Sequence, residues 1–309
     1  MEQVVAILCS GQGNQHREMF DLVKDVEEAR PVFAAASEQL GRDIRSFVRQ
    51  AELGELYSDR NGQLLCCTQA LAFWAALKPV QPKKAVIAGY SVGELAAWGC
   101  AGALDAPATL RLARQRSAAM DAATPEGSGL AAIVGLLESE LALIARNHGA
   151  YIAIVNAIDS FVIGGLGEAL EASCKEAAAK GATRTVRLRV AVPSHTPLLQ
   201  EAVQPFRAAL RAAAPQAPPY GYRLLSGIDG ETVWQPEAGC DKLANQICTT
   251  IHWAACLESC RAAGAVLALE LGPGAALSHM AASFFPEGRS RSVEDFRTLD
   301  GLRGWLARR

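Results

Sequence analysis

Short apolar runs alternate along the chain with longer stretches in which apolar residues recur at helical spacing. The runs at residues 4–8, 85–88 and 266–271 have the length of buried strands. Residues 68–77 predict a strongly apolar helix. This alternation of strands and helices indicates an α/β fold.

A further helix is expected to follow Asp105. Its carboxylate is a suitable N-cap, and Pro107 fits the first turn. The helix should end near Ala123, because the Pro-Glu-Gly run at 125–127 stops it. Surface loops or turns are expected at 79–84, 215–219 and 272–274.

The middle of the chain has a pattern of its own. Strands are predicted at 130–136, 150–156, 161–164 and 183–190, and helices at 138–147 and 167–180. The order β-α-β-β-α-β is typical of a ferredoxin-like fold. We therefore expect a small ferredoxin-like domain at 127–190, inserted into a larger domain formed by 1–126 and 191–309.

Composition narrows the class of protein. Half of the residues are hydrophobic, 20% are charged, and the formal net charge is -2. The chain has no excess of basic residues, so nucleic acid is not expected as a partner. The N-terminus does not resemble a signal peptide, and no window approaches the roughly 20 apolar residues of a membrane span. We therefore expect no membrane partner.

The nine cysteines are scattered and odd in number, which argues against a disulfide framework and favours a cytoplasmic location. The spacing of Cys248, Cys256 and Cys260 leaves a metal site open, but no convincing paired ligand set accompanies them. Core packing is the preferred interpretation, and no metal is expected.

The sharpest motif is G-Y-S-V-G-E at 89–94, between the strand at 85–88 and a following helix. A G-x-S-x-G sequence in this context is typical of a nucleophile elbow, in which a strained turn exposes the serine. A side chain at Gly89 or Gly93 would collide with neighbouring backbone. Ser91 is therefore the candidate nucleophile, and the N–H of Val92 could stabilise an oxyanion. A structural alternative is a capping box formed by Ser91 and Glu94.

A serine nucleophile needs a base, and His195 is the best candidate among five histidines. It lies between two prolines, after a strand and at the return to the larger domain. His148 is expected to be solvated at a helix end, whereas His252 and His279 fall on predicted helices. A loop histidine can also be merely solvated, so position alone leaves both interpretations open.

Arg116 shares the apolar face of its helix with Leu112, Ala113 and Met120, whereas Arg111 and Arg114 pair on another face. A guanidinium on an apolar face needs an anionic partner. A ligand carboxylate would supply one, and an internal salt bridge to Asp or Glu is the alternative.

Six motifs together resemble the malonyl-CoA:acyl-carrier-protein transacylases and the acyltransferase domains of polyketide synthases. They are G-Q-G-N-Q at 11–15, G-Y-S-V-G-E at 89–94, Q-R-S-A-A-M at 115–120, V-P-S-H at 192–195, Gln246 seven residues before Trp253, and E-L-G-P-G at 270–274. They occur in the family's order over nearly the whole chain.

The resemblance implies an α/β-hydrolase-like large domain with a ferredoxin-like insert. It also implies that Ser91 accepts malonyl from malonyl-CoA and passes it to the phosphopantetheine-type thiol of an acyl carrier protein. His195 would be the base, Arg116 would bind the malonyl carboxylate, and no cofactor would be bound permanently. The N–H groups of Gln12 and Val92 would form the oxyanion hole, and the carbonyl of Gln246 would orient the histidine.

Two departures refine the resemblance. Tyr90 replaces the family's usual histidine, and Cys9-Ser10-Gly11 replaces its F-P-G. Together they are similar to the transacylase (epsilon) subunit of malonate decarboxylase, in which other subunits of that enzyme would be partners. Transacylases of fatty-acid or polyketide synthesis are the alternative.

Other functions fit less well. A dinucleotide loop would need a glycine where His16 stands. An esterase or thioesterase would use the same elbow, but Arg116 argues against a neutral acyl chain. A catalytically inactive partner subunit is disfavoured because Ser91 and His195 are present. Arg184, Arg187 and Arg189 could meet an acidic carrier protein or could be a solvated strand face.

Overall fold

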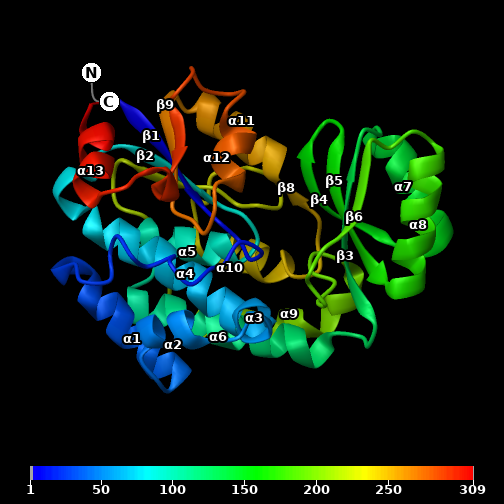
Figure 1. Cartoon of the computed structure of the whole chain (residues 1–309), viewed down its shortest axis with the longest axis horizontal. Coiled ribbons are helices and arrows are strands. Elements are labelled where there is room, and N and C mark those ends of the chain that lie inside the picture. The colour runs from blue at the N-terminus through cyan, green and yellow to red at the C-terminus, as the bar shows by residue number, and fades with distance from the viewer. Residues whose placement is uncertain (1–2, 309) are drawn as a thin grey trace.

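The computed structural model describes residues 3–308, whose strands form two five-stranded sheets (Figure 1). All neighbouring strands of the first sheet are parallel. Its order is β10 (Ser290–Ser292), β9 (Ala265–Glu270), β1 (Val4–Cys9), β2 (Ala85–Gly89) and β7 (Tyr222–Leu224). The strands expected at 4–8, 85–88 and 266–271 are thus confirmed as β1, β2 and β9.

Both faces of this sheet are buried. Val5 and Ile7 of β1 face a large core that contains residues of α4, α5 and α6, whereas Ala6 and Leu8 face a second cluster with Trp253. A parallel sheet covered on both faces needs apolar residues at every position, which explains the continuous apolar runs.

The helices cover the sheets and fill the connections between strands. They are α1 (Arg30–Leu40), α2 (Ile44–Gln50), α3 (Leu53–Tyr57), α4 (Asp59–Ala76), α5 (Val92–Cys100), α6 (Ala106–Ala123), α7 (Glu138–His148), α8 (Gly167–Ala179), α9 (Gln200–Ala212), α10 (Pro236–Asn245), α11 (Trp253–Ala262), α12 (Ala276–Ala281) and α13 (Leu299–Ala307). Single turns of 3-10 helix are η1 (Glu27–Ala29), η2 (Lys78–Val80), η3 (Pro197–Leu199) and η4 (Val293–Asp295). Within residues 3–308, no helix is both long and apolar enough to span a bilayer.

Helix α6 confirms the predicted capping. The Asp105 carboxylate accepts from the N–H of Ala108 at 2.7 Å, and the helix ends at Ala123. The prediction for α4 was too short, because this helix begins at Asp59 rather than near residue 68. Gly62 and polar neighbours obscure the apolar pattern of its first turns, although Gly62 and Gln63 are buried.

The second sheet has the order β6 (Arg184–Arg187), β3 (Ser128–Val134), β5 (Ser160–Leu166), β4 (Tyr151–Ala157) and β8 (Ile251–His252). Strand β3 is antiparallel to β5 and β6, and β4 is antiparallel to β5. Helices α7 and α8 pack on one face of this sheet. The predicted order β-α-β-β-α-β is therefore present between residues 128 and 187.

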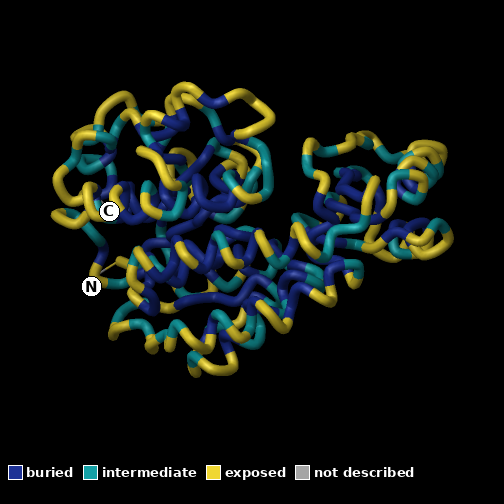
Figure 2. Tube along the Cα trace, turned by 90° about the horizontal axis from the view of Figure 1, so that it is seen from below, coloured by how far each residue is buried: buried dark blue, intermediate teal, exposed yellow. Residues whose placement is uncertain are grey.

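Two details differ from the sequence prediction. Strand β6 ends at Arg187 and does not reach residue 190. Strand β8 comes from a later part of the chain and extends the sheet by pairing in parallel with β4. His252 therefore lies in a strand and not in a helix as predicted, because Ile251 and His252 pair with Ile154 and Val155. Figure 2 shows buried segments passing between the two parts of the molecule that carry the sheets.

Candidate active site

Ser91 lies between the end of β2 and the start of α5, in a strained backbone conformation. Its φ of 56° and ψ of -122° are unusual for a residue with a side chain. Such strain costs about 1–3 kcal/mol and persists only where the surroundings enforce it. This is the local geometry expected of a nucleophile elbow.

Two glycines make the turn possible. A Cβ on Gly89 would lie 2.1 Å from backbone atoms of Gly93 and Glu94, and a Cβ on Gly93 would lie 2.0 Å from the carbonyl oxygen of Cys9. Because rigid backbone atoms cannot move out of the way, neither position accepts a side chain. The steric requirement predicted from the sequence is confirmed.

The Ser91 hydroxyl is engaged by His195. Ser91 Oγ lies 2.8 Å from His195 Nε2, and His195 Nδ1 lies 2.6 Å from the backbone carbonyl oxygen of Gln246. A carbonyl can only accept, so Nδ1 carries the proton and Nε2 is left to accept from the serine. The structure thus joins Ser91, His195 and Gln246 in one chain of hydrogen bonds without a carboxylate.

His195 is buried and stays uncharged. Burial, followed by the nearby Arg116 guanidinium, lowers its pKa to about 3, against the opposing effect of the Gln246 carbonyl. A neutral imidazole with a free Nε2 is the form that can take a proton from serine.

The capping-box interpretation of Ser91 and Glu94 is wrong. The Ser91 side chain makes no capping hydrogen bond to α5. Glu94 Oε2 instead accepts from the N–H of Gly227 at 3.0 Å and from Gln246 Nε2 at 2.5 Å. Burial raises the pKa of this carboxyl to about 7.

Arg116 is completely buried on α6. Its Nη1 donates to Gln63 Oε1 at 2.9 Å, its Nη2 donates to Gln246 Oε1 at 3.0 Å, and its Nε has no partner. No carboxylate of the described chain pairs directly with this guanidinium, so the internal salt bridge considered from the sequence is absent there. The guanidinium hydrogen-bonds only to neutral amides, and the Asp59 and Glu94 carboxylates lie one residue further away, so a direct anionic partner is still missing.

Gln246 connects the two halves of the site. Its backbone carbonyl holds His195, its side-chain oxygen holds Arg116, and its Nε2 donates to the Ser91 carbonyl at 3.2 Å. The serine, the histidine and the arginine therefore belong to one connected cluster, although 104 positions separate Ser91 from His195 and 130 separate Arg116 from Gln246.

Two backbone N–H groups near Ser91 are unpaired in the described chain. Val92 is the first residue of α5, so its N–H has no acceptor within the helix. The N–H of Gln12, in the loop after β1, also has no protein acceptor, while the Gln12 side chain donates to Asp59. Unpaired N–H groups are available donors for developing negative charge.

A cavity of about 210 Å³ opens beside Ser91 and His195. Leu130, Ile154 and Val162 of the second sheet form part of its wall, together with residues of the loop that contains Gln12. Arg116 is not among the lining residues. Gln246 links it to Ser91, because Gln246 accepts from Arg116 and donates to the Ser91 carbonyl. The cavity suits a short acyl chain or a slender arm, since one wall is apolar.

The two departures from the family pattern both lie at this cavity. The Tyr90 ring packs edge to face on Trp253 at 5.5 Å, and burial raises the pKa of its hydroxyl, so no base stands there. Ser10 Oγ donates to Glu270 Oε1 at 2.7 Å, while Glu270 Oε2 accepts from the N–H of Ser278.

The remaining candidate residues lie elsewhere. Cys256 and Cys260 are buried in the second core cluster, and Cys248 directs its thiol toward Gln200. Among residues 3–308, no group of three potential ligands could hold a metal ion. His148 is half-buried at the end of α7 and contacts Glu176 at 2.7 Å, so it is paired as well as solvated.

Sequence reasoning missed Gln63 and Asp59. Both lie in the first turns of α4, which were not predicted as helix. The only local signal was a glutamine before an apolar run, and that signal does not reveal an arginine 53 positions away.

Known proteins resemble the chain throughout its length. Residues 7–281 match the family model of the acyl transferase domain. The malonyl CoA-acyl carrier protein transacylase of Escherichia coli (strain K12) is 30% identical over 280 residues, covering 88% of this chain and 90% of the relative.

Two solved structures are also similar. The acyl-carrier-protein S-malonyltransferase of Burkholderia pseudomallei superposes with a TM-score of 0.88 at 30% identity, covering 98% of this chain and 100% of the other. A malonyl-transacylase in complex with its type II polyketide-synthase acyl-carrier protein has a TM-score of 0.88 at 26% identity, covering 98% and 99%.

Proposed function

Because the chain belongs to the acyl transferase domain family, and within it to the malonyl CoA-acyl carrier protein transacylases, we propose that it moves a malonyl group from malonyl-CoA to the phosphopantetheine-type thiol of an acyl carrier protein. The observation that carries this proposal is the hydrogen-bonded cluster of Ser91, His195, Gln246 and Arg116. Related proteins are named for the same transfer, and one was solved with its carrier.

In the first half-reaction, Ser91 Oγ attacks the thioester carbonyl of malonyl-CoA while His195 Nε2 takes the hydroxyl proton. The oxyanion that forms accepts from the N–H groups of Gln12 and Val92. Collapse of the tetrahedral intermediate breaks the C–S bond, and the CoA sulfur takes the proton from His195. The carrier thiol then repeats these steps in reverse, which restores free Ser91.

Arg116 supplies the selection for malonyl. A planar guanidinium binds a carboxylate with two parallel charge-assisted hydrogen bonds, which an acetyl group cannot form. Gln63 accepts from Nη1 and Gln246 accepts from Nη2, and these two hydrogen bonds hold the guanidinium in place. The unpartnered Nε supports an anion as the missing partner.

The test is the covalent intermediate. After mixing with malonyl-CoA, intact-protein mass spectrometry should detect one malonyl adduct on the wild type and none on Ser91→Ala, because the variant lacks the nucleophile. An adduct on Ser91→Ala would remove this serine from the mechanism. Release of malonate to water, without transfer to any carrier thiol, would favour the esterase or thioesterase alternative.

The pathway served is a narrower proposal. The relatives and solved structures favour a transacylase of fatty-acid or polyketide synthesis. Tyr90 and Ser10 support the second candidate, the transacylase subunit of malonate decarboxylase, because the family usually has other residues at these two positions. The Tyr90 ring packs on Trp253, and Ser10 donates to Glu270. Transfer rates to the two kinds of carrier protein, compared at equal concentration, would separate these candidates.

The domain division is proposed on similar grounds. An α/β-hydrolase-like catalytic domain of residues 1–126 and 191–309 would hold the reacting groups, and a ferredoxin-like domain of residues 127–190 would cover the acyl pocket. The strand order β6-β3-β5-β4 supports it, as do the five cavity residues that residues 127–190 contribute, namely Leu130, Ile154, Val162, Leu188 and Val190. Substitution of Leu130 by a larger residue should then obstruct acyl entry without unfolding the catalytic core.

A further inference from the structure

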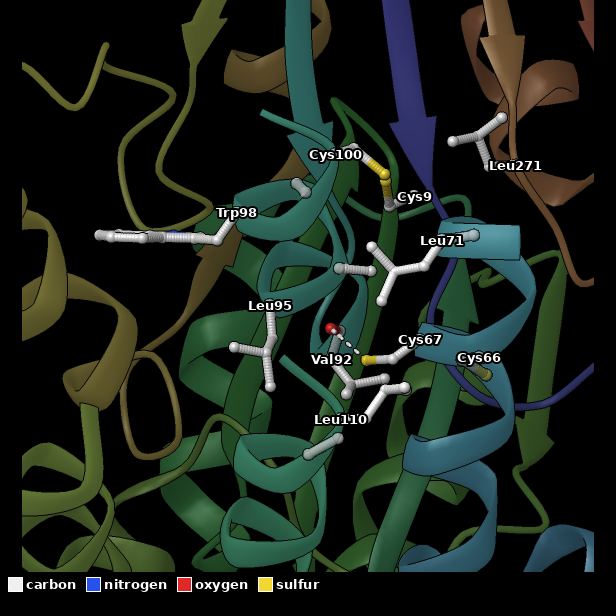
Figure 3. Packing of buried hydrophobic residues seen from close by; sticks show 14 of the residues in the cluster. Cys9, Cys66, Cys67, Leu71, Val92, Leu95, Trp98, Cys100, Leu110 and Leu271 are labelled. Atoms are coloured by element: carbon white, nitrogen blue, oxygen red, sulfur yellow. Dashed lines mark hydrogen bonds between the residues drawn. The ribbon is translucent and has the colours of Figure 1, made fainter. Parts of the chain in front are cut away.

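One face of helix α4 contacts both the loop that contains Gln12 and the partners of Arg116. Asp59, Gly62, Gln63 and Cys66 share this face, since their spacing is i, i+3, i+4 and i+7. Cys66, labelled in Figure 3, lies on α4 next to Cys67 among the packed side chains of the large core. The helix is therefore placed between two parts of the site that do not adjoin in sequence.

Asp59 binds both parts directly. Its Oδ1 accepts from Gln12 Nε2 at 2.8 Å, and its Oδ2 accepts from Gln63 Nε2, also at 2.8 Å. Each carboxylate oxygen thus takes one amide donor. Hydrogen bonds to an ionised carboxylate are shorter and about twice as strong as those between neutral groups.

The bond to Gln63 determines which way its amide faces. Gln63 presents its oxygen to Arg116 Nη1 only while its NH₂ group has an acceptor on the other side, and Asp59 is that acceptor. A flipped amide would present its own N–H donors to the guanidinium. Asp59 therefore fixes the orientation of a group that holds Arg116.

The bond to Gln12 fixes the loop after β1. Gly62 leaves space for the Gln12 amide, because a Cβ there would lie 2.2 Å from Gln12 Oε1. Cys66 Sγ donates to the carbonyl oxygen of Gly11 at 3.3 Å. Since a trans peptide directs its C=O and N–H to opposite sides, the N–H of Gln12 points away from α4.

On the basis of the proposed function, we propose that Asp59 is a positioning residue that couples the oxyanion-binding N–H of Gln12 to the carboxylate-binding guanidinium of Arg116. It touches neither the substrate nor the reacting atoms. It acts through the Gln12 side chain on the rate of acylation, and through Gln63 on the preference for a malonyl group.

A simpler role would be stabilisation of the start of α4. Asp59 is the first residue of that helix, where an acidic group is favourable. However, Ser58 caps the helix by accepting from the N–H of Asn61 at 3.4 Å, and both Asp59 oxygens are used by side chains of the site. A purely helical role would change stability and leave acyl selectivity alone.

The experiment measures single-turnover acylation of Ser91 by malonyl-CoA and by acetyl-CoA. Asp59→Asn keeps the shape of the side chain but replaces one acceptor oxygen by a donor. We expect malonyl transfer to fall about tenfold or more, with a smaller loss for acetyl, so that the malonyl preference declines. Asp300→Asn is the matched control, since its side chain is 95% exposed on α13 and should change neither rate.

Two single-branch variants separate the two effects. Gln12→Met keeps the backbone N–H but loses the bond to Asp59, so both acyl donors should react more slowly by a similar factor. Gln63→Met should reduce only the malonyl reaction. In the double variant Asp59→Asn/Gln63→Met, the loss of malonyl preference should be less than the product of the single losses, because both changes break the same connection.

The outcomes are distinguishable. If the wild type is malonylated but Asp59→Asn keeps its rates and its malonyl-to-acetyl ratio, the coupling role is refuted and the proposed function stands. If the wild type forms no malonyl adduct, the proposed function fails and the inference fails with it. Should Asp59→Asn not fold, equal acylation rates in Gln12→Met and the wild type would still refute the role.

Discussion

At the residue scale, each polar group of the site has a defined partner that leaves one function free. His195 uses Nδ1 on a carbonyl and keeps Nε2 for Ser91. Arg116 uses its two terminal nitrogens on glutamines and keeps Nε unpaired. The proposed chemistry therefore depends on the two nitrogens that these partners leave available, His195 Nε2 for the serine proton and Arg116 Nε for an anion.

Arg116→Ala should lose the preference for malonyl-CoA over acetyl-CoA. Hydrogen bonds to charged groups contribute about 1.5–3 kcal/mol, so the ratio of kcat/KM values should fall by about tenfold or more. Acylation by each thioester, measured as adduct formation on Ser91, gives the ratio.

Arg116→Lys provides the comparison, because an ammonium keeps the charge and loses the bidentate geometry. Its selectivity should lie between those of the wild type and the alanine variant. Thermal unfolding must be measured as well, since removing this buried side chain leaves the side-chain oxygens of Gln63 and Gln246 without their donor. An unchanged ratio in a folded Arg116→Ala would show that another group recognises the carboxylate.

At the element scale, local sequence patterns correctly predicted several strands and helices. The prediction failed for elements whose bounds depend on contacts between distant parts of the chain. The continuous apolar run of β1 and the cap at Asp105 are local signals, and both predictions were right. The start of α4 and the strand at His252 were missed, because packing beneath the site and pairing with β4 determine them.

The same distinction applies to the site. The elbow could be predicted because its glycines and serine are contiguous and their steric reason is local. Gln63 and Asp59 could not, since their partners lie 53 and 47 positions away along the chain. Such pairings depend on the tertiary fold, which periodicity does not encode.

Charge reversal at Arg184 of β6 and at Arg189, two residues beyond the end of β6, tests the surface proposed for the carrier protein. β6 is an edge of its sheet, Arg184 and Arg189 are exposed, and Arg187 also contacts the Gly167 carbonyl at 3.4 Å. Arg184→Glu/Arg189→Glu should slow transfer from malonyl-Ser91 to an acidic carrier protein by roughly tenfold at low salt. Acylation by malonyl-CoA should be unchanged, because that step does not involve the carrier.

Lys78→Glu is the matched reversal at an exposed position on η2. It should leave transfer unchanged, and the effect of the double reversal at Arg184 and Arg189 should weaken as ionic strength rises. Equal transfer rates for the double variant and the wild type would mean that the arginines only keep this edge of the sheet solvated.

At the scale of the whole molecule, segments from both ends of the chain support the site. The loop after β1 carries Gln12 and also His16, whose Nε2 lies 2.8 Å from Glu294 Oε1 on η4. Gln69 of α4 donates to the same Glu294 oxygen at 3.0 Å. The N-terminal loop, α4 and the C-terminal segment are thus joined by one carboxylate.

This junction gives stability a defined pH dependence. The hydrogen bond to Glu294, opposed by burial, raises the pKa of His16. Burial alone would raise the pKa of Glu294, but the bonds from His16 and Gln69 lower it. The pair therefore stabilises the fold between the unfolded pKa values, about 4.3 for Glu and about 6.5 for His. The contribution from His16 is lost as pH rises through its raised folded pKa, and that from Glu294 is lost as pH falls through its lowered one.

Glu294→Gln should accordingly lower the free energy of unfolding most near pH 6 and much less near pH 9, because the charge on His16 is lost as pH rises through its raised folded pKa. Urea unfolding of the wild type and the variant at the two pH values measures the difference. Asp300→Asn, at an exposed position, should show no comparable pH dependence. A loss for Glu294→Gln that is the same at both pH values would mean that Gln69, rather than the charged histidine, accounts for the stabilisation. Because His16 lies four residues from Gln12 in the same loop, loosening this junction should also slow acylation at alkaline pH.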